Sequence, residues 1–253
     1  MALDFGGLLG EGPYKKREDW QLRAQEDLRQ KLEGKTAWPY QTFRSVLIYL
    51  GLTGGHVPAT ATPNEIDLGP LGQTMSKMMA ATNADGNERA VNYYAGLTTG
   101  KLIETPIKVG GKDHVNAYIP PDLKTDAKQK RVLGAHSHPS GVEGTIAETL
   151  AGADIGGFLK KENVAEVVVF NKGILMAVKT TVTPDNGNPQ KIDKGIKDTQ
   201  QELQQQYHLY RLSRISYGAN LSKWLALENG LSLYFGKLGQ PLKKVDLSLV
   251  VDL

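Results

Sequence analysis

Apolar residues recur every three or four positions through the first third of the chain, which is the spacing of one helix face. The first such stripe covers residues 20–32 and predicts a helix. A second, shorter helix is predicted over 43–50, ending at Gly51, and a third over 71–79. Together with the glycine-rich start of the chain, these stripes predict an N-terminal tail and helical extension over residues 1–84.

From residue 87 the pattern changes to short apolar and alternating segments that are separated by turn residues. Strands are predicted at 93–97, 101–104, 113–119, 131–135, 164–170 and 174–178. The sequence Asn171-Lys172-Gly173 predicts a tight turn that joins the last two strands into a hairpin. A helix is predicted over 155–161, before that hairpin. Residues 85–182 therefore form the expected α/β unit.

Helical spacing returns in the last third of the chain, followed by alternating residues and a turn. Two helices, an extended segment and a closing strand are predicted at 192–210, 221–227, 231–235 and 242–251. Residues 183–253 are therefore expected to form C-terminal helices and a closing β-hairpin, packed on the same domain. The expected fold class is α/β (α+β), a mixed β-sheet with packed helices.

The absence of cysteine limits the kinds of covalent bond, metal site and nucleophile that the chain can have. Among 253 residues there is no cysteine, which excludes disulfides, thiolate metal sites, iron–sulfur clusters and a cysteine nucleophile. Any metal must therefore be held by histidine, aspartate, glutamate or water. With 253 residues, the chain is long enough to bury a large core without disulfides or a metal clip.

Charge and hydropathy favour neither nucleic acid nor membrane as a partner. The chain has 30 basic and 27 acidic residues, a surplus of only +3. No apolar run approaches the 18 or so residues that a membrane span needs. The first residues have no basic segment before their apolar stretch, so we expect no signal peptide and a cytoplasmic location.

The stretch from Gly134 to Pro139, Gly-Ala-His-Ser-His-Pro, is the most informative in the chain. Side chains alternate between the two faces of a strand, so His136 and His138 should point the same way at the end of the strand that precedes them. Pro139 cannot donate a backbone hydrogen bond and is expected to end that strand. Two imidazoles in this arrangement are half of a tetrahedral zinc site.

A third ligand and a base complete the expected zinc site. Asp154 lies at the start of the helix that follows, where a carboxylate can turn back toward the strand end. The fourth position would then hold water, as in catalytic zinc sites. Glu88, at the entry to the first strand of the unit, is our candidate for the general base. Other candidates for this role are Glu104, Glu143 and Glu148.

The order of these residues resembles the JAMM metallopeptidases, also called JAB or MPN-plus, over roughly residues 85–180. The resemblance implies a JAB/MPN-like fold and hydrolysis of a peptide or isopeptide bond with zinc. It implies that His136, His138 and Asp154 hold Zn²⁺, and that Glu88 takes a proton and returns it to the leaving amine. The implied partner is a protein or peptide substrate, for example a ubiquitin-like modifier.

The chain departs from the family pattern in the loop after Pro139. Eleven residues separate Pro139 from the position where the family has a serine, against about seven in the family, and that position holds Ala151. The family's serine helps to stabilise the oxyanion. Candidate replacements are Ser137, Ser140, Thr145 and Thr149. The alternative function is a JAB/MPN-like protein-binding module that has lost catalysis; nothing in the sequence indicates an oligomeric state.

Overall fold

The protein, in a computed structural model, is described over residues 17–96, 99–116, 129–139, 150, 152–184, 189–210 and 214–247. The α-helices are α1 (Arg17–Leu32), α2 (Tyr40–Thr53), α3 (Pro70–Asp85), α5 (Gly152–Leu159), α6 (Pro189–Tyr210) and α7 (Arg214–Glu228). The strands are β1 (Ala37–Trp38), β2 (Glu65–Ile66), β3 (Arg89–Gly96), β4 (Lys101–Glu104), β5 (Lys108–Val109), β6 (Gln129–Ser137), β7 (Ala165–Phe170), β8 (Gly173–Lys179), β9 (Leu231–Gly236) and β10 (Leu242–Lys244). The class is thus mixed α and β, as expected.

The strands form one mixed ten-stranded sheet in the order β1-β2-β10-β9-β8-β7-β6-β3-β4, with β5 also paired to β3. Strands β6 and β7 run parallel, as do β1 and β2, and the other pairs are antiparallel. A parallel pair needs a crossover, and α5 lies within the crossover from β6 to β7. This connection brings the start of α5 to the carboxyl end of β6.

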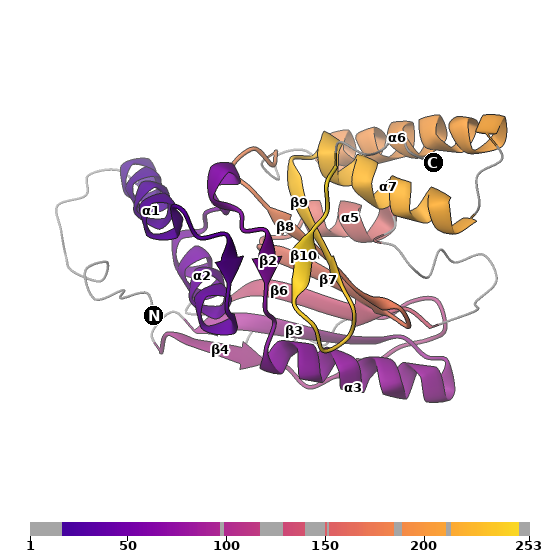
Figure 1. Cartoon of the computed structure of the whole chain (residues 1–253), viewed down its shortest axis with the longest axis horizontal. Helices are drawn as coiled ribbons and strands as arrows, with labels where there is room; N and C mark the ends of the chain where they lie inside the picture. The colour runs from indigo at the N-terminus through magenta and orange to yellow at the C-terminus, as the bar shows by residue number, and fades with distance from the viewer. Residues whose placement is uncertain are drawn as a thin grey trace.

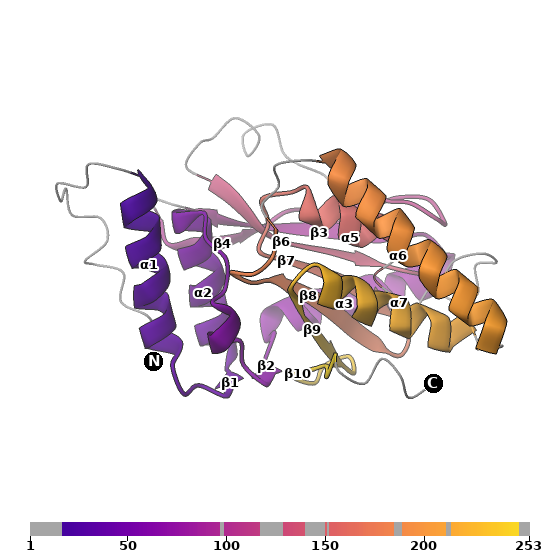
Figure 2. The same cartoon turned by 90° about the horizontal axis from the view of Figure 1, so that it is seen from above.

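Helices cover the sheet on both sides, as Figures 1 and 2 show from two directions. One cluster of buried residues joins α1, α2 and α3 to one face. A second cluster joins α5, α6 and α7 to the other face. Strands β7 and β8 lie between the two layers and are buried along their whole length, which explains their nearly continuous apolar sequences.

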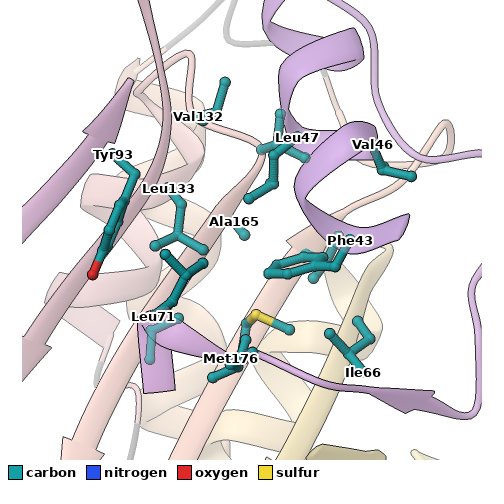
Figure 3. Packing of buried hydrophobic residues seen from close by; sticks show 14 of the residues in the cluster. Phe43, Val46, Leu47, Ile66, Leu71, Tyr93, Val132, Leu133, Ala165 and Met176 are labelled. Atoms are coloured by element: carbon teal, nitrogen blue, oxygen red, sulfur yellow. The ribbon is translucent and has the colours of Figure 1, made fainter. Parts of the chain in front are cut away.

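The larger cluster lies under α2 and α3. Figure 3 shows side chains from these helices gathered with strand residues, among them Phe43, Leu47, Leu71, Leu133, Ala165 and Met176. These residues come from segments that are more than a hundred positions apart. The N-terminal helices therefore form part of the same core as the central strands.

Most predicted elements are confirmed, including the hairpin of β7 and β8 around Asn171-Lys172-Gly173. The prediction that a helix ends at Gly51 is wrong, because α2 continues to Thr53 and is capped by Gly54 in the left-handed conformation, with φ of 66°. Gly51 instead allows α2 to pack closely against the sheet, because glycine has no Cβ. An ideal Cβ there would lie 2.7 Å from the Cβ of Ala95.

The strand predicted at 113–119 is also wrong over 113–116, and its remaining residues lie outside the described part of the chain. The short strand β5 precedes it and pairs with the start of β3. β5 ends at Val109, and the backbone N–H of Gly111 donates to the carbonyl oxygen of His114. Strands β1 and β2 lie within the predicted helical extension and were not predicted. No helix in the described residues is long and apolar enough to cross a membrane.

Candidate metal centre

The two histidines lie at the carboxyl end of β6, on the face that α5 covers. His136 is opposite Ala90 of β3 and beside Val168 of β7, and the backbone N–H of His138 donates to the carbonyl oxygen of Val169. As the alternation of a strand requires, both imidazoles point to the same side. Their Nε2 atoms are 3.1 Å apart and their ring centroids 4.9 Å apart.

Asp154 comes from the first turn of α5. The helix is anchored by its apolar residues Ile155, Phe158 and Leu159, which are buried in the second cluster. This anchoring turns Asp154 toward the strand end. Its Oδ1 is 3.3 Å from Nε2 of His136, and its Oδ2 is 3.8 Å from Nε2 of His138.

The spacing of these three groups suits a metal ion. One ligand atom from each of His136, His138 and Asp154 can be chosen so that all lie within 4.8 Å of one another. Ligands about 2.1 Å from a tetrahedral zinc ion are about 3.4 Å apart, and the separations of 3.1, 3.3 and 3.8 Å bracket that value. The predicted ligand set is therefore brought together, and it could hold a metal ion.

Glu88 lies next to this group, one residue before β3. Its backbone exchanges hydrogen bonds with Gly110 and Gly111, at 2.8 and 2.7 Å. It is two residues before Ala90, which is opposite His136, so the register places Glu88 on the same face as the histidines. The side chain is buried, with 7% of its surface exposed.

Burial and neighbouring charge act on the Glu88 carboxyl. Burial raises its pKa above the usual range; the charge of His136 opposes this rise and that of Asp154 adds to it. A carboxyl whose pKa is raised toward neutrality is better suited to accept and return a proton near pH 7.

In the protein without a metal, His136 lies between the carboxylates of Asp154 and Glu166. Burial alone lowers its pKa, but Asp154 and Glu166 outweigh burial and raise the pKa to about 10. Glu166 lies on β7, with its Oε1 3.8 Å from Nδ1 of His136. Glu166 was not among the predicted site residues. The available signal was a charged residue within the otherwise apolar strand Ala165–Phe170.

Ser137 does not face the metal group. It is fully buried on the opposite side of β6, where its hydroxyl is 2.6 Å from that of Thr82 and accepts the backbone N–H of Arg89. The Arg89 guanidinium in turn makes a bidentate pair with Asp85 at 2.9 and 2.6 Å. These contacts hold the end of α3 against β3 and β6, so Ser137 has a structural role.

The other candidates are separated from the site or not described. Glu104 is opposite Tyr93 and lies on the face that carries α3, where its carboxylate accepts a hydrogen bond from Thr74 at 3.1 Å. The remaining candidates fall outside the described residues: Ser140, Glu143, Thr145, Glu148, Thr149 and Ala151. Among the described carboxylates considered for the base, Glu88 is thus the one beside the histidines.

The chain was compared with protein-family models, with curated proteins and with solved structures. None of the three comparisons gives a match. The resemblance to the JAMM metallopeptidases therefore rests on the residues of the site and on their order along the chain.

Proposed function

We propose that this chain is a zinc-dependent hydrolase that cleaves peptide or isopeptide bonds, with a JAB/MPN-like fold. One observation carries the proposal. A His-His-Asp group with tetrahedral spacing lies beside a buried glutamate on the same face of the sheet. The donor set of two imidazoles and one carboxylate, with no thiolate, is that of catalytic rather than structural zinc sites.

His136, His138 and Asp154 would hold the ion. A zinc ion bound there supplies Lewis acidity, which lowers the pKa of water toward about 7 and polarises the scissile carbonyl. Glu88 would accept a proton from the attacking water and return it to the leaving amine. Its burial supports this role, because a raised pKa lets one carboxyl act first as base and then as acid.

The substrate class comes from the resemblance to the JAMM family. A protein tail or an isopeptide-linked ubiquitin-like modifier is the corresponding substrate. The proposed ligands and the proposed base all lie in the described residues, whereas residues 140–149 do not. We therefore propose the bond type and leave the identity of the protein substrate to direct cleavage tests.

The deciding experiment measures zinc and cleavage in the same set of variants. We expect about one zinc per chain by elemental analysis, and loss of that zinc in the His136→Ala, His138→Ala double variant. Glu88→Gln should keep the zinc and lose cleavage of an isopeptide-linked modifier by about 10²-fold or more. Glu104→Gln, a matched carboxylate-to-amide change on the opposite face, should keep both.

Two results would contradict the assignment. Loss of zinc in Glu88→Gln would make Glu88 a ligand instead of the base, and cleavage at the wild-type rate would remove it from the mechanism. A second function is favoured by Ala151, which stands where the family has a hydroxyl, and by the turning away of Ser137. A chain that binds zinc, captures a modifier and never cleaves it would be a binding module.

A further inference from the structure

We propose that Glu166 is a positioning residue, which holds the imidazole of His136 with its Nε2 atom directed at the metal. This inference rests on the proposed zinc site and goes beyond its ligands and base. A metal-bound histidine commonly presents its other ring nitrogen to a carboxylate, which fixes the ring orientation and the tautomer. Glu166 is the described carboxylate on the Nδ1 side of His136, at 3.8 Å.

The Glu166 carboxylate is itself held in place by two donors. Its Oε2 accepts a hydrogen bond from the Asn163 side chain at 2.7 Å and from the Arg131 guanidinium at 3.3 Å. Oε1 is the atom that faces His136. The side chain is 8% exposed, so little water competes for these contacts. A carboxylate fixed in this way favours a proton on Nδ1 and leaves the lone pair of Nε2 toward His138 and Asp154.

A β-bulge in β6 brings Arg131 to this face. Leu133 is opposite Tyr93, but the next partner, Tyr94, is opposite Arg131, so Val132 is the extra residue. Without the bulge, the alternation of the strand would place Arg131 on the face opposite His136. With it, Arg131 lies on the same face as His136 and reaches Glu166.

Gly134 leaves room for this pair to lie across β6. An ideal Cβ at position 134 would be 2.0 Å from Nη2 of Arg131 and 2.6 Å from Oε2 of Glu166. Any side chain there would displace the carboxylate from its place beside His136. All of these features orient the Glu166 carboxylate toward His136, the proposed metal ligand: the bulge at Val132, the absent side chain at Gly134, and the two donors Asn163 and Arg131.

The test is the zinc affinity of Glu166→Gln, measured by competition with a chelator. We expect a loss of about 10–100-fold relative to the wild type, the usual effect of removing such a partner. Asp85→Asn is the control: it breaks a carboxylate–arginine pair on the opposite face, where Asp85 is 42% exposed, so it should leave the zinc affinity unchanged. A second readout is the ¹⁵N spectrum of the zinc-loaded protein. The proton of His136 should be on Nδ1, and it should exchange with water faster in Glu166→Gln.

The outcomes separate this inference from the proposed function. If the wild type binds no zinc, the zinc site and this inference fail together. If the wild type binds zinc and Glu166→Gln binds it equally well, the site stands and the role of Glu166 is refuted. Coordination through Nδ1 of His136 would also refute it, because Glu166 would then face the wrong nitrogen.

Discussion

Glu88, Glu166 and Lys179 are charged, buried side chains on the face of the sheet that carries the metal group. Lys179 is one of them, with only 1% of its surface exposed. Its ammonium lies 4.8 Å from the centre of the Phe158 ring and donates to the carbonyl oxygen of Lys161. Burial lowers the pKa of Lys179 to about 8, although the charge of Glu166 opposes this shift. The folded state therefore holds this proton less tightly than the unfolded chain does.

Because the pKa of Lys179 is lower in the folded state than in the unfolded chain, burying its charge lowers the stability of the protein at neutral pH. The free-energy cost of burying charged Lys179 is full below about pH 8 and disappears as the pH rises toward 10.5, the pKa of a free lysine. Lys179→Met should raise the free energy of unfolding by about 1–3 kcal/mol at pH 7, and by less at pH 10. Denaturant unfolding at both values measures it. Lys243→Met, at an exposed position on β10, is the control and should change little. A destabilised Lys179→Met would mean that the contacts of the ammonium outweigh its burial.

Helix α2 illustrates how one position sets the distance between a helix and the sheet. At Gly51 the helix passes over the bulge of β6, where an ideal Cβ would lie 2.7 Å from both Ala95 Cβ and Val132 Cγ1. Neither neighbour is the end of a long flexible side chain, so α2 would have to move away. The glycine that looks like a stop signal in the sequence is therefore a packing contact.

Gly51→Ala should lower the free energy of unfolding by about 1–2 kcal/mol. Alanine favours a helix over glycine by up to about 1 kcal/mol, but overpacking in a core costs about 1–3 kcal/mol. Gly195→Ala is the matched control, since Gly195 is an exposed residue of α6 with no atom within 4 Å of an added Cβ. It should raise stability by about 0.5–1 kcal/mol. Thermal melts of the two variants should thus shift in opposite directions; a stabilised Gly51→Ala would contradict the packing argument.

Features that depend on neighbouring residues could be predicted from the sequence, whereas features that depend on contacts with distant strands could not. The β7–β8 hairpin depends on a local turn, and the shared direction of His136 and His138 depends on strand alternation, so both follow from neighbouring residues. Arg131 could not be assigned to their face, because the bulge at Val132 is defined only by pairing with β3. The position of Gly51 depends on β3 in the same way. Glu166 reaches His136 from another strand, thirty positions along the chain.

At the scale of the whole molecule, the sheet is built from every part of the chain. Strands β1 and β2 come from before residue 85, and β9 and β10 from after residue 182. β10 pairs with β2 at Leu242 and Ile66, and with β9. Tyr234 of β9 donates to the carbonyl oxygen of Pro63 at 3.0 Å. The two ends of the described chain therefore close one edge of the sheet together.

The segment over residues 85–182 carries all four proposed site residues, yet we expect that it does not fold alone. Removing α2 and α3 would expose one face of β6 and β7, and removing β9 and α7 would expose β8 and the buried face beneath them. A fragment with both apolar faces uncovered loses most of the burial that offsets chain entropy. Expressed by itself, it should lack a cooperative melt by circular dichroism and bind zinc more weakly than the full chain, which should melt in a single transition. A fragment that melts cooperatively and binds one zinc with the affinity of the full chain would show that the flanking helices and strands are additions to a self-sufficient domain. The flanking helices and strands would then be expected to bind a partner, because neither folding nor zinc binding would depend on them.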